Sequence, residues 1–259
     1  MTQGYLFIAN GEKYATMLKT YTIPSIRHFD KTRPISILTS TPEFFDSSVN
    51  IIVYNPEEQS KKYAHLQQSE YFILGTIPKL VIFDLSPYDE TLYLDADVIN
   101  MKDIEPFWSE CSNSDKQIII AGESDADNRA PSHWHWHSIN IVMHYTGLNI
   151  PRINGGVHYW KRITDFMSVI EPYLMDPLKY GIRPLFRGGF VDEIFISIYL
   201  GIKGIHPITD EEAATPNPNS IQSYRYDYHT ASNAQFYHCF NKDTMPAYYQ
   251  LFLERNSHP

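Results

Sequence analysis

Short apolar runs typical of β-strands alternate with helix-like segments, and this alternation constrains the fold more than any other feature. The apolar runs lie at residues 5–9, 35–39, 51–54, 91–95 and 117–121, with later strands expected at 156–161 and 236–240. Helical spacing begins at Glu12, where Pro24 is expected to end or kink the helix. Further helices are expected at 78–85, 162–174 and 191–201, and a long irregular loop at 210–228. The pattern predicts an α/β fold.

Length and charge limit the classes of protein that this chain can belong to. The 259 residues contain no linker-like Gly/Ser run, so we expect one domain over residues 1–259. The net charge of −9 argues against nucleic acid as a partner and against docking on anionic membranes. Cys111 and Cys239 indicate free thiols in a reducing compartment, and no segment predicts a signal peptide or a membrane span. We therefore expect a cytoplasmic protein whose oligomeric state stays open, a homodimer being one option.

The sharpest local signal lies at residues 92–98, where an apolar strand leads directly into Asp95 and Asp97. Because the chain turns at the end of a strand, both carboxylates can reach one point. Hard divalent cations take such oxygen ligands together with substrate phosphates, and the metal can neutralise charge that develops on a departing phosphate. The alternative is an acidic turn that only caps the strand.

Three further motifs carry polar groups suited to a sugar or a metal. Asn154 precedes Gly155 and Gly156, so an amide could bond sugar hydroxyls where the backbone approaches closely. Asp192 and Glu193 open a predicted helix, a position that the helix dipole alone can explain. His238 lies among aromatic residues of a predicted strand, where a core histidine is the ordinary interpretation. Each motif alone therefore has a structural explanation.

In this order, the motifs resemble those of the glycogenin-like retaining glycosyltransferases, glycosyltransferase family 8. The resemblance begins at residues 5–15 and is most specific at Lys79 and the stretch 88–98. It continues through Asn154-Gly155-Gly156-Val157, Asp192-Glu193 and His238, and extends over residues 5–246. The late segment departs from the family pattern, since Asn241 stands where a glycine is common and Lys242 comes early.

The resemblance implies a single GT-A domain with a Rossmann-like mixed sheet flanked by helices. It implies transfer of a hexose from a UDP-sugar to a hydroxyl acceptor on a glycan or protein, with Mn²⁺ (or Mg²⁺) held by Asp95, Asp97 and His238. The implied catalytic residues are Asp192, Lys79 and Asn154. The implied donor-binding residues are Ile8, Asn10, Tyr14, Lys79, Asp95, Ala96, Asp97, Asn154, Gly155, Asp192, Glu193 and Lys242. Among them, Tyr14 is expected to stack on uracil near the carboxyl edge of the sheet.

The stretch 133–137 alternates histidine and tryptophan. If it is extended, three histidines share one face and could bind a transition metal. We expect instead that Trp134 and Trp136 lie at the acceptor site, where indole rings can stack on sugars, and an aromatic loop with a structural role is the third interpretation.

Two other functions stay open at this point. A sugar nucleotidyltransferase would carry a Gly-rich basic loop near its N-terminus, and residues 10–13 match such a loop poorly. The second alternative is a non-catalytic module that binds nucleotide-sugars. The presence of intact Asp95, Asp97 and His238 argues against it.

Overall fold

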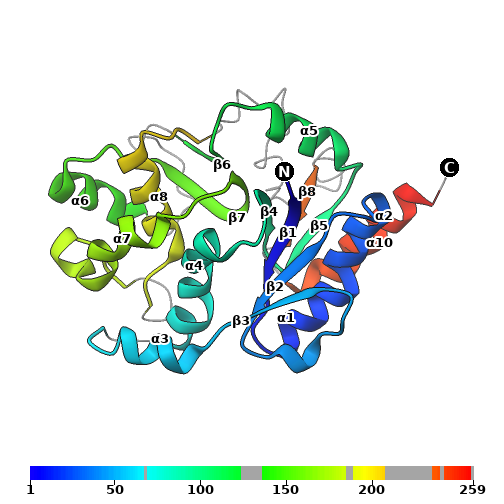
Figure 1. Ribbon diagram of the computed structural model, residues 1–259, viewed down its shortest axis with the longest axis horizontal. Helices are drawn as coiled ribbons and strands as arrows, with labels where there is room; N and C mark the ends of the chain where they lie inside the picture. Colours follow the sequence, from blue (N-terminus) through cyan, green and yellow to red (C-terminus); the bar gives the residue numbers. More distant parts are fainter. Residues whose placement is uncertain (67–68, 124–135, 185–188, 208–234, 240–241, 258–259) are drawn as a thin grey trace.

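The computed structural model describes residues 1–66, 69–123, 136–184, 189–207, 235–239 and 242–257. Within these residues, the main sheet has the order β3-β2-β1-β4-β7-β6 (Figure 1). Its strands are β1 (Gln3–Ile8), β2 (Ile35–Thr39), β3 (Asn50–Val53), β4 (Glu90–Leu94), β6 (Ile118–Glu123) and β7 (Arg152–Lys161). β1, β2, β3 and β4 run parallel, whereas β7 is antiparallel to both β4 and β6. This is the mixed sheet that was expected.

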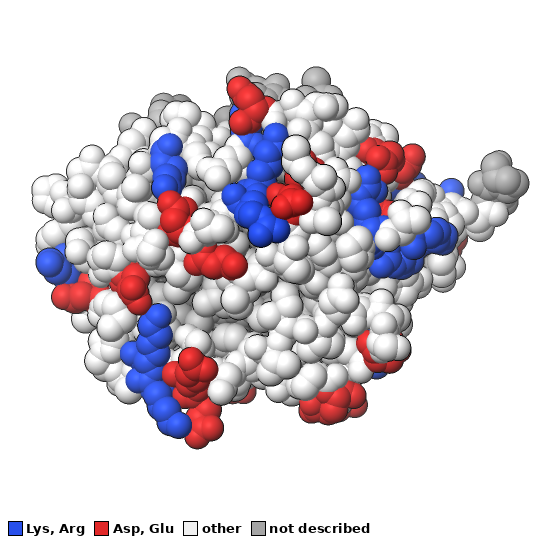
Figure 2. Space-filling model, in the orientation of Figure 1, with Lys and Arg blue, Asp and Glu red and all other residues white. Residues whose placement is uncertain are grey.

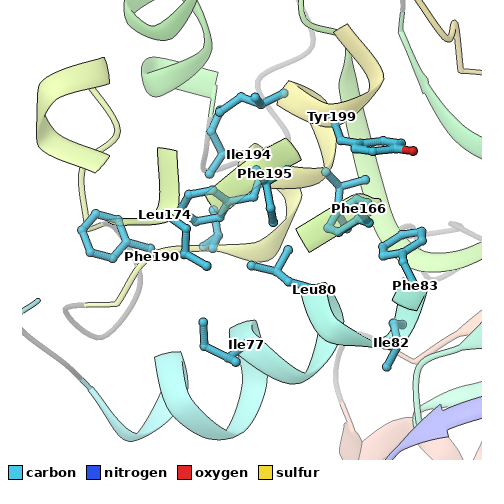
Figure 3. Close-up of a cluster of buried hydrophobic side chains, with 14 of the residues drawn as sticks. Ile77, Leu80, Ile82, Phe83, Phe166, Leu174, Phe190, Ile194, Phe195 and Tyr199 are labelled. Carbon is cyan, nitrogen blue, oxygen red and sulfur yellow. The ribbon is translucent and has the colours of Figure 1, made fainter. Parts of the chain in front are cut away.

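Alternating side chains of these strands enter two hydrophobic clusters on opposite faces of the sheet, because successive strand residues point to opposite faces. The first cluster packs Leu6, Leu38, Tyr93 and Trp160 against α4 (Ile77–Leu85), α7 (Phe166–Met175) and α8 (Asp192–Lys203). Figure 3 shows the side chains of these three helices converging, with Phe83 of α4 beside Phe166 of α7. The second cluster packs Tyr5, Phe7, Ile37 and Leu94 against α2 (Ile23–Phe29) and α5 (Glu105–Asn113).

A small second sheet lies at the edge of the second cluster. It pairs β5 (Val98–Asn100) antiparallel with β8 (Phe236–His238), so a strand from late in the chain reaches the residues directly after β4. Helix α10 (Met245–Asn256) covers this sheet through Tyr248 and Phe252, which pack with Tyr237 and Ile99.

Pro24 was expected to end or kink the first helix, and the structure shows that it does not end it. Helix α1 (Glu12–Met17) continues through a π-turn, Leu18–Thr22, directly into α2, in which Pro24 is the second residue. Proline has no N–H for the bond to the residue four positions earlier, and the wider π-turn carries the helix past that point. A second π-turn, Phe72–Thr76, leads in the same way into α4, with Pro78 as its second residue.

Most predicted strands and the helices at 78–85, 162–174 and 191–201 are confirmed within a few residues. The helices α3 (Pro56–Lys62), α5, α6 (Trp136–Thr146) and α10 and the strand β5 were not predicted. Because α6 begins at Trp136, the extended conformation considered for 133–137 is wrong for Trp136 and His137. Trp134 and the predicted loop at 210–228 lie outside the described residues.

On the face shown in Figure 2, basic and acidic side chains lie beside one another rather than in one continuous basic patch. Ion pairs at the surface include Arg162 with Asp89 at 3.1 Å and Lys62 with Glu171 at 3.1 Å. Across the described part of the chain, no helix combines the length and the apolar character needed to cross a membrane.

A buried ionic network ties β1 to the loop after α2. The carboxylate of Asp30 accepts hydrogen bonds from Tyr5 Oη at 2.7 Å and Arg33 Nη1 at 2.9 Å, and Arg33 also pairs with Glu105 at 2.8 Å. Burial raises the pKa of Asp30, but the bonds from Arg33 and Tyr5 outweigh burial and hold that pKa far below its usual value. The network therefore requires the ionised carboxylate.

We expect Asp30→Asn to lower the free energy of unfolding by about 1.5–3 kcal/mol at neutral pH, the range for hydrogen bonds to charged groups. Because the folded-state pKa is depressed, this stabilisation is present above the unfolded pKa of about 3.9 and is lost as pH falls below it. The free energy of unfolding of wild type and variant is measured with denaturant at about pH 7 and about pH 3. The difference between the two proteins should be smaller at the lower pH. Asp115→Asn, at an exposed acid, is the control. A gap that widens at low pH would contradict this account.

Candidate active site

The antiparallel direction of β7 brings two motifs together at the carboxyl end of β4. β4 ends at Leu94, which pairs with Val157, so Asn154, Gly155 and Gly156 lie beside the turn that follows β4. The backbone N–H of Asp95 donates to the carbonyl of Gly156 at 2.8 Å. The structure thus places Asn154 and the two glycines against the Asp95–Asp97 turn.

Asp95, Asp97 and His238 form one cluster, in which one potential ligand atom from each lies within 4.8 Å of the others. Asp97 Oδ1 lies 3.1 Å from His238 Nε2, and Asp97 Oδ2 lies 3.1 Å from Lys242 Nζ. Val98 pairs with His238 across β5 and β8, and this pairing delivers the histidine to the turn. Asp97 is 6% exposed, so it is a buried acid and not a solvated cap of the strand.

Charged neighbours shift the pKa values of Asp97 and His238 in opposite directions. Burial raises the pKa of Asp97, but the positive charges of His238 and Lys242 outweigh burial and bring it well below the usual range. Burial lowers the pKa of His238, but the carboxylates of Asp97 and Asp95 raise it by more. The net shift of the His238 pKa is therefore upward. Asp97 and His238 therefore each favour the charged form of the other.

The two glycines after Asn154 are required by close contacts. A Cβ at Gly156 would lie 2.6 Å from both Cε1 and Nδ1 of His238, and a Cβ at Gly155 would lie 2.9 Å from Asp192 Oδ2. Both distances are shorter than real side chains allow. Glycine at 156 therefore makes room for the histidine, and glycine at 155 makes room for the acid of α8.

Lys79 of α4 connects the cluster of Asp95, Asp97 and His238 to α8. Its Nζ lies 2.9 Å and 3.0 Å from the two oxygens of Asp95 and 3.7 Å from Asp192 Oδ2. Burial lowers the pKa of Lys79, but Asp192 and Asp95 raise it well above the usual value, so the lysine is charged. The sequence placed Lys79 at the donor, and the structure places it between the two acids.

Asp192 and Glu193 are the first residues of α8, where the helix dipole favours acids. Acids that only interact with the helix dipole can stay exposed to solvent. Asp192 and Glu193, however, are only 3% and 7% exposed. Glu193 Oε1 accepts from the N–H of Gly155 at 3.1 Å. Burial raises the pKa of Asp192 to about 6, with Lys79 opposing and Glu193 adding to the increase. Buried acids of this kind are characteristic of functional sites.

Tyr14 and Lys242 lie next to one another beside the cluster. Lys242 Nζ is 4.8 Å from the centre of the Tyr14 ring, and the tyrosine is 38% exposed. The ring therefore offers a flat, accessible surface beside a cation that also contacts Asp97. Although Lys242 comes early in the late segment, the structure brings it to the site.

Three other predicted donor residues have structural contacts. The Asn10 side chain donates to the Leu74 carbonyl at 2.7 Å and accepts from the N–H of Ser40 at 2.7 Å, so it ties two loops together. Ile8, at the end of β1, packs against the first hydrophobic cluster. Ala96 is buried between the two aspartates, and its carbonyl accepts a hydrogen bond from Thr22.

The prediction from sequence missed the role of Tyr93. This buried tyrosine donates its hydroxyl to Asp95 Oδ1 at 2.5 Å and stacks on the ring of His158. Residues 93 and 95 are two apart, and such residues on a strand face the same side. That spacing was the signal that could have identified Tyr93.

The fold and the site define a class, since a mixed sheet with an Asp-x-Asp turn at the end of a strand, beside buried acids, is the arrangement of a GT-A glycosyltransferase. Mouse xyloside xylosyltransferase 1, in its apo form, shares the fold at 13% identity and a TM-score of 0.54, over 92% of this chain and 97% of that one. The galactosyltransferase LgtC, crystallised with donor and acceptor sugar analogs, shares it at 14% identity and a TM-score of 0.55, over 96% and 95%. The model of glycosyl transferase family 8 matches residues 17–147, and the chain belongs to that family. No curated protein matches the sequence.

Proposed function

We propose that this glycosyltransferase is metal-dependent and retaining, and that it transfers a hexose from a UDP-sugar to a hydroxyl of a glycan or protein. The observation that carries the proposal is the cluster of Asp95, Asp97 and His238, with Lys242 and Tyr14 beside it. Family membership favours this function over a sugar nucleotidyltransferase or a non-catalytic module. A single domain and a cytoplasmic location stay predictions.

The chemistry of the cluster fits a divalent transition metal. Two carboxylates and one imidazole offer oxygen and nitrogen ligands, which suit Mn²⁺ better than Mg²⁺, a cation that prefers oxygen alone. Asp95, Asp97 and His238 would hold the ion, and when bound it would supply positive charge to the leaving diphosphate. The ion pairs that these residues now make with Lys79 and Lys242 keep their side chains at the same point.

The residues around the cluster have matching roles in this proposal. Lys242 would bind a donor phosphate, because its charged Nζ lies 3.1 Å from Asp97 and its side chain is 29% exposed. Tyr14 would stack on the uracil ring, which fits its exposed aromatic surface. The nucleotide and the adjoining part of the donor sugar would contact Ile8, Asn10, Ala96 and Gly155.

Asp192, Glu193 and Asn154 would hold the transferred sugar on the α8 side of the cluster. Asp192 is buried beside Lys79 and Gly155, so it can accept hydrogen bonds from sugar hydroxyls. A double displacement would instead need its carboxylate as a nucleophile at the anomeric carbon. We favour front-face transfer, in which Lys79 stabilises the leaving charge. Trp134 and Trp136 remain the proposed acceptor contacts.

The test uses UDP-α-glucose and UDP-α-galactose with Mn²⁺ and no acceptor, and follows hydrolysis by proton NMR from the first minutes. We expect release of UDP and an α-anomeric sugar as the first product, since retention keeps the configuration of the donor. A GDP-sugar with the same hexose is the matched control and should react more slowly. A first-formed β-anomer would contradict retention. Release of pyrophosphate from a nucleoside triphosphate and a sugar phosphate would indicate the nucleotidyltransferase instead.

A further inference from the structure

The sequence Thr-Ile-Pro occurs twice, at residues 22–24 and 76–78, and both copies have the same local structure. Thr22 ends the first π-turn and Thr76 ends the second, and in each case the isoleucine and proline that follow begin an α-helix. Isolated π-turns within helices are rare and occur often at functional sites. Two copies in one chain call for a common explanation.

Neither threonine uses its hydroxyl within its own helix. Thr22 and Thr76 occupy the N-cap positions of α2 and α4, yet neither side chain makes a capping hydrogen bond. Both residues are 0% exposed, so each hydroxyl needs a partner elsewhere in the protein. Proline at the second helical position removes one of the N–H groups that a threonine cap would accept from. Each hydroxyl instead donates its hydrogen to a backbone carbonyl of another segment.

Thr22 contacts the turn that carries Asp95 and Asp97. Its Oγ1 donates to the carbonyl of Ala96 at 2.8 Å, between Asp95 and Asp97. The same helix is linked to β5, since Ser25 Oγ donates to the Thr22 carbonyl at 2.7 Å and accepts from the N–H of Asn100 at 3.0 Å. The first π-turn thus holds the segment that carries both aspartates.

Thr76 contacts the segment that leads into α8. Its Oγ1 donates to the carbonyl of Phe190 at 2.6 Å, two residues before Asp192. Phe72, the first residue of the second π-turn, packs edge-to-face on the ring of Phe190 with centroids 5.7 Å apart. Figure 3 shows Phe190 at the border of the cluster formed by α4, α7 and α8. The second π-turn thus holds the start of the helix that carries Asp192 and Glu193.

We propose that Thr22 and Thr76 are positioning residues, each of which holds one half of the active site through a backbone carbonyl. Thr22 fixes the turn of Asp95 and Asp97 for the metal, and Thr76 fixes Asp192 and Glu193 for the transferred sugar. The inference rests on the proposed function, because it assigns the metal to one half and the sugar to the other. Neither threonine touches substrate in this scheme.

The experiment compares four full-length variants. Thr22→Val and Thr76→Val keep the shape of the side chain and remove the donor, whereas Thr22→Ser and Thr76→Ser keep the donor. Circular dichroism verifies folding, and Thr22→Ala or Thr76→Ala replaces a valine variant that does not fold. Two quantities are measured: the dissociation constant for Mn²⁺ alone, by electron paramagnetic resonance of the unbound ion, and kcat/KM for UDP-sugar hydrolysis at saturating Mn²⁺.

We expect Thr22→Val to weaken Mn²⁺ binding roughly 10-fold or more, the effect of losing a group that orients metal ligands. Thr76→Val should leave Mn²⁺ affinity within about twofold and lower kcat/KM roughly 10-fold, through misplacement of the sugar acids. Each serine variant should stay within about twofold of wild type, because its hydroxyl bond is retained. Each valine variant is thereby the matched control for the other, and a general loss of stability would not separate the two readouts.

Two results overturn the inference in different ways. If wild type binds Mn²⁺ and Thr22→Val binds it equally well, or if both valine variants change both quantities in parallel, the positioning roles are wrong and the proposed function stands. If wild type itself does not bind Mn²⁺, the metal dependence in the proposed function fails and the role of Thr22 fails with it.

Discussion

Asp97→Asn is expected to lower UDP-sugar turnover by roughly 10³-fold or more, because the proposed function makes Asp97 a charged metal ligand and turnover dependent on the electrostatic stabilisation that the metal supplies. Asp97 contacts His238 and Lys242 through separate oxygens, so asparagine keeps the shape but leaves two cationic groups without their common anion. Turnover is measured as UDP release with Mn²⁺ varied over a wide range. Affinity for Mn²⁺, measured without donor, should fall in the same variant.

Asparagine is a better test than alanine here, since Asp97 is 6% exposed and a cavity would confuse loss of fold with loss of function. Asp115→Asn changes charge equally at an exposed position and should leave turnover within about twofold, as is usual for surface substitutions. An Asp97→Asn enzyme that keeps full turnover in the presence of EDTA would show that the acid holds no metal.

Gly156→Ala is expected to weaken Mn²⁺ binding and to lower turnover roughly 10- to 100-fold, the range for displacing groups around a metal. The new Cβ would lie 2.6 Å from two atoms of the His238 ring, so either the ring leaves Asp97 or β7 moves away from the turn. Movement of β7 would also stretch the bond from Asp95 N–H to the Gly156 carbonyl. Calorimetric titration with Mn²⁺ measures the first effect, and UDP release measures the second.

Gly155→Ala is the matched comparison, one residue away. Its Cβ would lie 2.9 Å from Asp192 Oδ2 and away from the histidine, so it should impair donor hydrolysis and lower Mn²⁺ affinity less than Gly156→Ala does. If Gly156→Ala binds Mn²⁺ like wild type, His238 is not a ligand and the proposed metal site is wrong.

The sequence predicted the strands and the main polar motifs because both leave local patterns. Short apolar runs identified the sheet, and Asp95, Asp97 and Asp192 each stand directly at the end or start of an element, whereas Asn154 is the third residue of β7. His238 was predicted through the resemblance, and only the pairing of β5 with β8 explains how it reaches the turn. That pairing joins residues far apart in the chain, and short strands carry little pattern of their own.

Prolines account for most of the helices that were missed or misplaced. Helices α2, α3, α5 and α10 each have proline at the first or second position. Proline is favoured there because the first N–H groups of a helix have no partner within it. Because Pro24 was expected to end or kink a helix, the start of α2 at the first Thr-Ile-Pro sequence was not predicted. The burial of Asp97 was also not predictable, since it depends on β8 covering the turn.

The position of β8 separates two events during synthesis of the chain. The six strands of the main sheet are complete by Lys161, whereas His238 enters the turn of Asp95 and Asp97 only with β8. Because a chain emerges from the ribosome N-terminal end first, the sheet can form while the last metal ligand is still being made. A nascent or truncated polypeptide that stops before β8 would therefore contain the sheet and both aspartates but not the complete metal site. The proposed cation-binding centre therefore becomes complete only after β8 has been synthesised.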